Sequence, residues 1–176
     1  MLDYTKEELL SLIETNPEKF NEWKKDRDDV DLSEVDFSNM IIKEVDFTDV
    51  DLNSSSFSDC HLSLVNFYGA DLTAVDFTRA VVTECDFTES ILTGADCSYA
   101  EMTYCNFTDC DMAGTVLSET VLTSSDLTAA ENLSSARYDN DTVWPDDDMM
   151  PAEFDTVYKD DLSSLKDDED SAVEDY

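Results

Sequence analysis

The chain has 176 residues, of which 44 are Asp or Glu and 10 are Lys or Arg, so its formal net charge at pH 7 is −34. This charge excludes ordinary nucleic-acid binding, which needs a basic surface, and favours a basic protein partner or a solvent of very high salt. The sequence has no apolar run near the roughly 18 residues of a membrane span and no N-terminal signal-peptide core. We therefore expect a cytoplasmic protein that binds neither nucleic acid nor a membrane directly.

Residues 1–29 are expected to form two short helices. Thr5 and Glu8 have the spacing of a capping box, and Asn16 with Pro17 has the pattern of an N-cap followed by the first residue of a second helix. A basic cluster that we expect to face solvent follows, formed by Lys24, Lys25 and Arg27.

From Val30 to Ala129 the sequence repeats every five residues. These 100 residues divide into twenty consecutive pentads without an insertion, and the central residue of each pentad is apolar. A residue of limited size lies two positions before each centre, and Met40 is the largest of these residues. A period of five fits neither a helix nor a strand, and it is typical of a solenoid whose units bury their apolar side by stacking on their neighbours.

The pattern resembles the A(D/N)LXX consensus of the pentapeptide-repeat family, as in Ala-Asp-Leu-Thr-Ala at residues 70–74 and Val-Asp-Phe-Thr-Asp at residues 45–49. The resemblance covers 100 of the 176 residues. It implies an all-β solenoid, a right-handed quadrilateral β-helix of about five coils, in which four pentads complete one turn. The centre and the small residue before it would point inward. Residues 1–29 would then cap the open first coil.

Residues twenty apart should stack, because four pentads close a turn. The centres then form four core columns in which Phe and aliphatic residues are sorted, so that large and small groups interdigitate. The columns are Leu32, Leu52, Leu72, Leu92 and Met112; Phe37, Phe57, Phe77, Cys97 and Leu117; Ile42, Leu62, Val82, Met102 and Leu122; and Phe47, Phe67, Phe87, Phe107 and Leu127.

The repeat register slips by one residue at Glu131-Asn132-Leu133. We expect residues 130–158 to form a C-terminal cap, because Tyr138 and Trp144-Pro145 resemble the closing segment of the family. Residues 159–176 are mostly acidic and are expected to be a disordered tail.

The five cysteines occupy inward positions of the repeat, where Cys serves as a small apolar group. Cys85 and Cys105 would stack at a separation inside the range of a disulfide, which leaves a redox role open beside the simpler reading of reduced core thiols. We expect no cofactor and no metal site, because His61 is the only histidine and its position faces outward.

Three of the four faces carry acids at the position before the centre, and we expect these acids to bind a basic partner. They are Asp31, Asp51, Asp71 and Asp111 on the first face, Asp36, Asp76 and Asp96 on the second, and Asp46, Asp86 and Asp126 on the fourth. On the fourth face, Asp49, Glu89 and Asp109 reinforce them two positions after the centre.

The third face is instead apolar. Its exposed positions, with their neighbours, include Ile41, Val81, Val121, Leu64, Tyr104 and Val116. An apolar stripe on an acidic rod suggests covering, either by the terminal segments or by a second protomer. If a second protomer covers the stripe, the C-terminal coils are where we expect the contact of the homodimer, as in characterised family members.

The repeat carries 19 acids and two bases, a net charge of −17. Over about 24 Å of stacked strands this is about one charge per 1.4 Å, close to the roughly 1.7 Å per charge of duplex DNA. We therefore favour a non-enzymatic DNA mimic that inhibits a basic DNA-binding enzyme. The family resemblance points to gyrase or another topoisomerase as the target. Acidic DNA mimics are also used by phages, so a nuclease of a host defence system is the other target that we consider.

The main alternative is a scaffold solenoid that mediates protein–protein contacts and whose acidity keeps it soluble, with adaptation to high salt as a variant. An enzyme is disfavoured, because the sequence has no nucleophile–base pair, metal-ligand cluster or Gly-rich phosphate loop.

Overall fold

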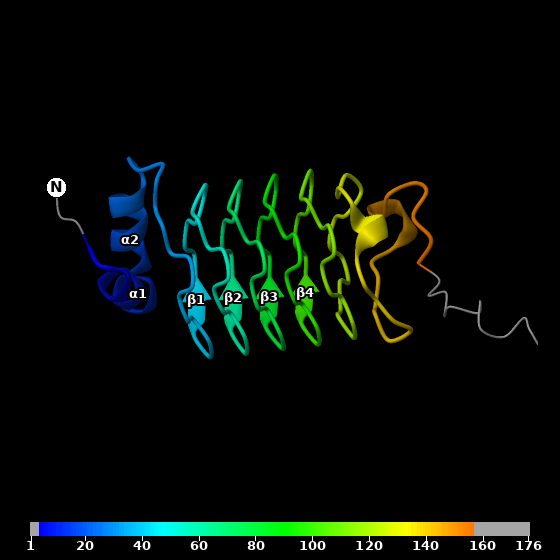
Figure 1. Cartoon of the computed structure of the whole chain (residues 1–176), viewed down its shortest axis with the longest axis horizontal. Coiled ribbons are helices and arrows are strands. Elements are labelled where there is room, and N and C mark those ends of the chain that lie inside the picture. Colours follow the sequence, from blue (N-terminus) through cyan, green and yellow to red (C-terminus); the bar gives the residue numbers. More distant parts are fainter. Residues whose placement is uncertain (1–3, 157–176) are drawn as a thin grey trace, which may run out of the picture.

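The computed structural model describes residues 4–156. It is an elongated stack of coils with two helices at its N-terminal end (Figure 1). The acidic tail predicted for residues 159–176, and the last two residues of the predicted C-terminal cap, lie outside the described residues. The division of the chain into domains at residues 29 and 129 stays a prediction.

A four-stranded parallel sheet runs along one side of the stack, in the order β1-β2-β3-β4. Its strands are β1 (Ile41–Lys43), β2 (His61–Ser63), β3 (Val81–Thr83) and β4 (Glu101–Thr103). The register pairs each residue with the one twenty positions later, as in Ile42 with Leu62. Isolated bridges with the same spacing run along the other three sides, beginning with Asp31 to Asp51, Asp36 to Ser56 and Asp46 to Asn66. The predicted stacking is therefore confirmed, and the chain is a β-helix solenoid.

The interior consists of the predicted columns of centre residues. All of them are buried, and the Phe rings stack within each column while they meet edge to face between columns. Phe67, for example, lies 5.4 Å from Phe47 and 4.9 Å from Phe87 in its own column, measured between ring centroids. It meets Phe57 and Phe77 of the neighbouring column at 5.9 and 6.2 Å. The predicted assignment of the Phe residues to two of the four columns is therefore confirmed.

The N-terminal helices begin where the capping patterns predict. Thr5 and Glu8 form a capping box at the start of α1 (Lys6–Thr15). The Asn16 side chain accepts a hydrogen bond from the Lys19 backbone at the start of α2 (Pro17–Lys24). Phe20 of α2 lies 5.7 Å from the Phe47 ring, so this helix covers the exposed end of an aromatic column.

The expectation that the basic cluster near residue 25 faces solvent is wrong for two of its members. Lys24 is only 6% exposed. Arg27 stacks its guanidinium 4.3 Å from the centre of the Trp23 ring, and its Nη1 donates a hydrogen bond to the Trp23 carbonyl. Long basic side chains lay their methylene groups along apolar surface, which a count of neighbouring charges does not reveal.

The register slip at Asn132 is confirmed. Asp111 pairs with Glu131 at the usual spacing of twenty, whereas Val116 pairs with Arg137 and Val121 with Val143, at spacings of 21 and 22. Asn132 takes the extra place in a left-handed conformation, with a φ of 54°, and Leu133 is buried instead. Two short 3-10 turns follow, η1 (Leu133–Ser135) and η2 (Asp147–Met149).

Three aromatic residues gather beyond the slip. Trp144 lies 5.2 Å from both Tyr138 and Phe154, and the Tyr138 hydroxyl donates a hydrogen bond to the Asp155 carbonyl at 3.0 Å. This cluster ties residues 151–156 back onto the end of the repeat.

Replacing Phe67 with Ala should lower the free energy of unfolding by about 3–5 kcal/mol, because the change leaves a cavity beside four other rings. Urea unfolding followed by circular dichroism measures this loss. Replacing the exposed Thr123 with Ala is the matched control, and it should change the stability by less than about 0.5 kcal/mol. An equal effect of both changes would contradict a solenoid held by its aromatic columns.

Candidate functional site

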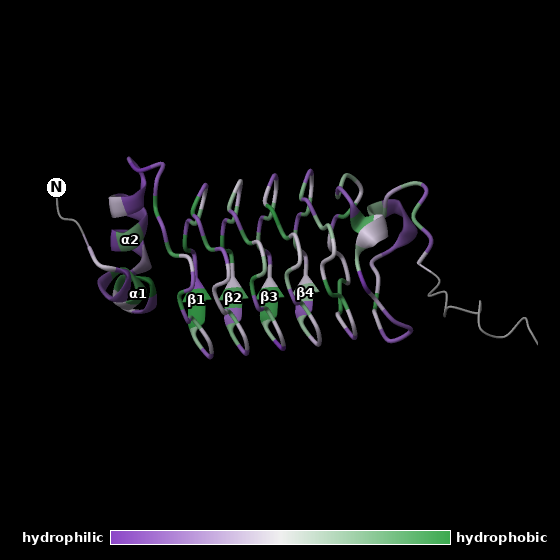
Figure 2. Cartoon of the chain, in the orientation of Figure 1, coloured by the Kyte–Doolittle hydropathy of each residue, from purple (hydrophilic) through white to green (hydrophobic). Residues whose placement is uncertain are grey.

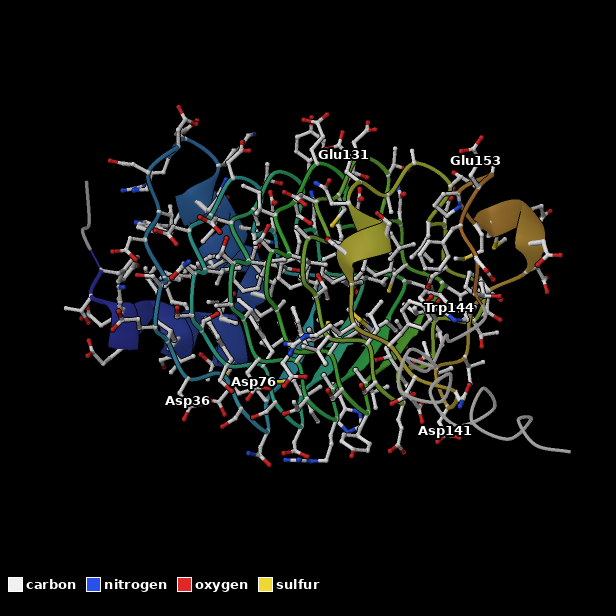
Figure 3. The ribbon with its side chains drawn as sticks, turned by 45° about the vertical axis from the view of Figure 1, so that its right-hand side comes forward. Asp36, Asp76, Glu131, Asp141, Trp144 and Glu153 are labelled. Atoms are coloured by element: carbon white, nitrogen blue, oxygen red, sulfur yellow. The ribbon has the colours of Figure 1, made fainter. Side chains whose placement is uncertain are left out.

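The acidic surface lies on three sides of the stack. The first face holds residues 31–33 and those 20, 40, 60 and 80 positions later. The second and fourth faces start in the same way from residues 36–38 and 46–48, and the third face contains β1 to β4. Figure 3 shows Asp36 and Asp76 of the second face on one side of the molecule, pointing away from the core. The predicted acids are thus spread around the rod and do not converge on a pocket.

The acids before each centre have a structural task. Each one accepts, through Oδ1, a hydrogen bond from the backbone N–H two residues later, at 2.8–3.0 Å. Asn66 and Asn106 accept the same bond at equivalent positions. These side-chain bonds satisfy backbone N–H groups that have no partner in the ladder between coils. This explains why the repeat uses Asp or Asn at the position before the centre. The residues concerned are Asp31, Asp36, Asp46, Asp51, Asp71, Asp76, Asp86, Asp96, Asp111 and Asp126.

The fourth face carries two short ladders of hydrogen-bonded polar side chains, each of which links two successive coils. Thr48 Oγ1 donates to Asp46 Oδ1 at 2.6 Å and accepts from Asn66 Nδ2 of the next coil at 3.0 Å. The same pair of bonds links Asp86, Thr88 and Asn106. These bonds fix the carboxylates in place, so that a partner would meet an ordered array of charges.

The corner positions, two residues after each centre, use a different backbone. They adopt left-handed conformations, with φ values of 54° to 56° for Asp49, Glu89 and Asp109. These three side chains are exposed and lie at the corner that follows the fourth face. Gly69 occupies the same corner, and a Cβ there would clash with Asp49 Oδ1, so the Asp49 carboxylate lies over the glycine.

Basic side chains pair with one acid of the first face, Asp31, and with Asp59 at the corner that follows the second face. The hydrogen bond from Lys6 Nζ, at 2.8 Å, is the main reason why the pKa of Asp31 falls to about 2. The Arg79 guanidinium contacts both oxygens of Asp59 at 2.7–2.8 Å and lowers the pKa of that carboxyl. Among residues 4–156, the ion pairs are these two and Lys43 with Glu44, so none involves a carboxylate of the fourth face.

Sequence reasoning missed Tyr68 on the fourth face. The Glu89 side chain beside Tyr68 is the largest cause of the raised pKa of the phenol, and the charges of Asp49 and Asp109 add to it. The sequence does mark Tyr68 as unusual, because the equivalent residue of the other coils is Thr, at residues 48, 88, 108 and 128. An exposed aromatic residue therefore lies within the acidic surface.

The apolar third face is exposed. Ile41 of β1 is 76% exposed, and Tyr104 and Leu64 at the neighbouring corner are 65% and 47% exposed. Val81, Val116 and Val121 are half-buried. Figure 2 shows hydrophobic colouring on this row at β1 and β3. Terminal residues within 4–156 thus leave this stripe uncovered, and the pairing with a second protomer stays a prediction.

Neither helix within residues 4–156 is long and apolar enough to cross a membrane. In the same part of the chain, no three His, Cys, Asp or Glu side chains are grouped so that they could hold a metal ion.

Comparison with models of protein families identifies the type of repeat. Residues 28–95 match a model described as a pentapeptide repeat region, and residues 100–137 match one described as pentapeptide repeats of eight copies. Together these stretches span more than half of the chain. The chain belongs to the pentapeptide-repeat family. A right-handed β-helix is the fold that this membership implies. A comparison with curated protein sequences finds no match.

Several solved pentapeptide-repeat structures resemble the chain. One, from the thylakoid lumen of Arabidopsis thaliana, is 29% identical with a TM-score of 0.37, over 59% of this chain and 65% of that one. HetL, involved in heterocyst differentiation regulation in the cyanobacterium Nostoc sp. strain PCC 7120, is 21% identical with a TM-score of 0.33, over 61% of this chain and 65% of HetL.

A third is a trypsin-treated form of QnrB1, a plasmid-mediated fluoroquinolone resistance protein. It is 18% identical with a TM-score of 0.43, over 62% of this chain and 57% of QnrB1. The match to this chain thus spans less than two thirds of each of these three proteins.

Replacing Asp76 with Ala should lower the free energy of unfolding by about 1 kcal/mol, because the Thr78 N–H loses its acceptor. Replacing Asp76 with Asn should cost much less, since asparagine makes this bond at residues 66 and 106. Both variants lose one charge, so urea unfolding isolates the hydrogen bond. Equal stabilities of the two variants would contradict the structural task of the acid.

Asp31 should make stability depend on pH. Its pKa lies near 2 in the folded protein against an ordinary 3.8, so its contribution is fully present above pH 3.8 and is lost as the pH falls towards 2. The difference in unfolding free energy between the wild type and Lys6→Met should therefore shrink over this range. In an Asp31→Asn background the dependence should disappear. A difference that stays constant down to about pH 2 would contradict this assignment.

Proposed function

We propose that this chain is a non-enzymatic mimic of duplex DNA, which occupies the basic groove of a DNA-handling enzyme and blocks it. The first partner that we propose is a topoisomerase of the gyrase type. The pentapeptide-repeat family includes inhibitors of these enzymes, and the repeat from Val30 to Ala129 runs without an interrupting loop, as in the inhibitory type. A nuclease of a host defence system is the second partner that we propose.

The sign of charge at the corners is the observation that carries the proposal. Of the 19 corner residues between Glu34 and Ser124, eight are acidic and one, Arg79, is basic. The turn hydrogen bond of the acids before each centre does not account for them. Asp adopts a left-handed backbone with little strain. Glu has no such preference, and a Glu in this conformation lowers the stability by about 1 kcal/mol relative to Gly. Five corners nevertheless hold Glu, which is expected if the charge itself is the selected property.

The spacing of the charges supports a DNA-like partner surface. Successive coils rise by about 4.8 Å, so the net charge of −17 gives the rod a linear charge density near that of duplex DNA. A basic groove shaped for DNA would attract such a rod strongly at low salt, and less strongly once salt screens both surfaces.

The fourth face with its corner is the contact surface that we propose. Its six acids are Asp46, Asp86, Asp126, Asp49, Glu89 and Asp109. The ladders of threonine and asparagine side chains hold the first two in fixed positions. Tyr68 adds an aromatic face on which an arginine of the partner can stack while it pairs with Glu89.

The test uses purified DNA gyrase and labelled duplex DNA. The full chain should displace the DNA, and the triple variant Asp46→Asn, Asp86→Asn, Asp126→Asn should do so severalfold less well. Its fold should be kept, because asparagine accepts the same turn bond on this face. Circular dichroism and the thermal midpoint verify the fold.

The matched control is Asp51→Asn, Asp71→Asn, Asp111→Asn, which removes the same number of charges from the first face. Its effect should be smaller. Equal losses in both variants would contradict the choice of the fourth face. Unchanged displacement by both variants, or displacement that does not weaken with salt, would contradict the mimicry and favour a scaffold that is acidic for solubility.

A further inference from the structure

Cys85 and Cys105 occupy the same inward position on successive coils. The bridge between Asp86 and Asn106 joins the coils beside them, and the Asn106 N–H donates to the Cys85 carbonyl at 3.1 Å. Adjacent strands lie about 4.8 Å apart, which is inside the range of Cα separations found in disulfides. Both cysteines are unbridged and only 2% exposed.

The two thiols lie at equivalent places behind one corner of the rod. Cys85 Sγ contacts the Thr83 carbonyl at 3.4 Å, and Cys105 Sγ contacts the Thr103 carbonyl at 3.5 Å. Cys105 Sγ also lies 3.7 Å from the Val82 carbonyl, which belongs to the coil of Cys85. The Cys105 thiol is therefore directed across the gap between the two coils.

This pair differs chemically from the other cysteines. The neighbouring Cys105 side chain lowers the pKa of Cys85 against the effect of burial, and the same pairing, together with burial, raises the pKa of Cys105 well above its ordinary value. Burial is the main cause that raises the pKa of Cys60 to about 11 and of Cys110 to about 12, with nearby carboxylates adding to it, and it raises the pKa of Cys97 further. Cys85 is thus the thiol among residues 4–156 that ionises most readily, and the thiolate is the reactive form.

We propose that Cys85 and Cys105 are a peroxide-sensitive pair that closes a disulfide between two coils of the rod. The Cys85 thiolate attacks one oxygen of hydrogen peroxide, which gives a sulfenic acid and releases hydroxide. Cys105, as a thiolate, then attacks the Cys85 sulfur, forming the S–S bond and releasing the second oxygen as hydroxide. With the two thiol protons these hydroxides become two waters, so the thiols lose two electrons and the peroxide gains them.

The disulfide would close a loop of one complete coil. Such a link restricts the unfolded chain and prevents the two coils from separating. Oxidation should therefore raise the thermal midpoint of the full chain, and a reductant should restore the original value. This inference does not depend on the proposed binding partner.

The test treats the folded full chain with hydrogen peroxide and maps its peptides by mass spectrometry after alkylation in denaturant. The expected product has lost two hydrogens and contains one link, between Cys85 and Cys105. Cys85→Ser should abolish the link and the rise in thermal midpoint. This variant should fold, because Ser125 already occupies the next inward position of the same column and bonds to the Cys105 N–H.

Cys97→Ser is the control variant, since Cys97 is a fully buried centre without this partner, and it should form the link as the wild type does. Absence of the link in the folded wild type would overturn the proposal. So would a link to Cys60, Cys97 or Cys110 at a similar yield, or a link that forms only after the chain is unfolded.

Discussion

The structure depends on one constraint, the backbone hydrogen bonds between each coil and its two neighbours. Leu52 donates to the Asp71 carbonyl of the coil that follows, and Asp51 donates to the Val30 carbonyl of the coil before. These bonds require every coil to have the same length, because an added residue would shift all later partners. The pairing spacing grows only after the last complete pentad, first at Asn132 and again before Val143, close to the aromatic cluster that ends the stack. The aromatic columns exist because this fixed spacing brings the same ring position into contact in coil after coil.

The same constraint separates the acids into two groups. Acids before a centre complete the backbone of the turn, and this task explains their number without any reference to a partner. Corner acids such as Glu84 and Glu89 stand on a left-handed backbone and add charge that the fold does not need. The proposed mimicry can therefore be explained in two steps. The turns require Asp or Asn before each centre, which already makes the rod strongly acidic, and the corner acids then raise its linear charge density to that of duplex DNA.

Periodicity is enough to predict the solenoid, its columns and the slip at Asn132, because stacked identical units convert sequence spacing directly into contacts. It also predicts the helix starts at Thr5 and Asn16, whose capping bonds are local. It fails for long side chains with distant partners. Lys6 pairs with Asp31 across 25 residues, and Arg27 lies on Trp23 instead of facing solvent. The role of Tyr68 was missed for a related reason, since its partner Glu89 lies on the following coil and only the register brings the two together.

The measurement that tests the central claim most directly is a pull-down from bacterial lysate with the full chain as bait, eluted with duplex DNA and, in parallel, with high salt. The account predicts that duplex DNA releases a topoisomerase, a nuclease or another DNA-binding enzyme, and that high salt releases the same protein. Retained proteins that duplex DNA does not displace would contradict the account and leave the acidic rod as a scaffold.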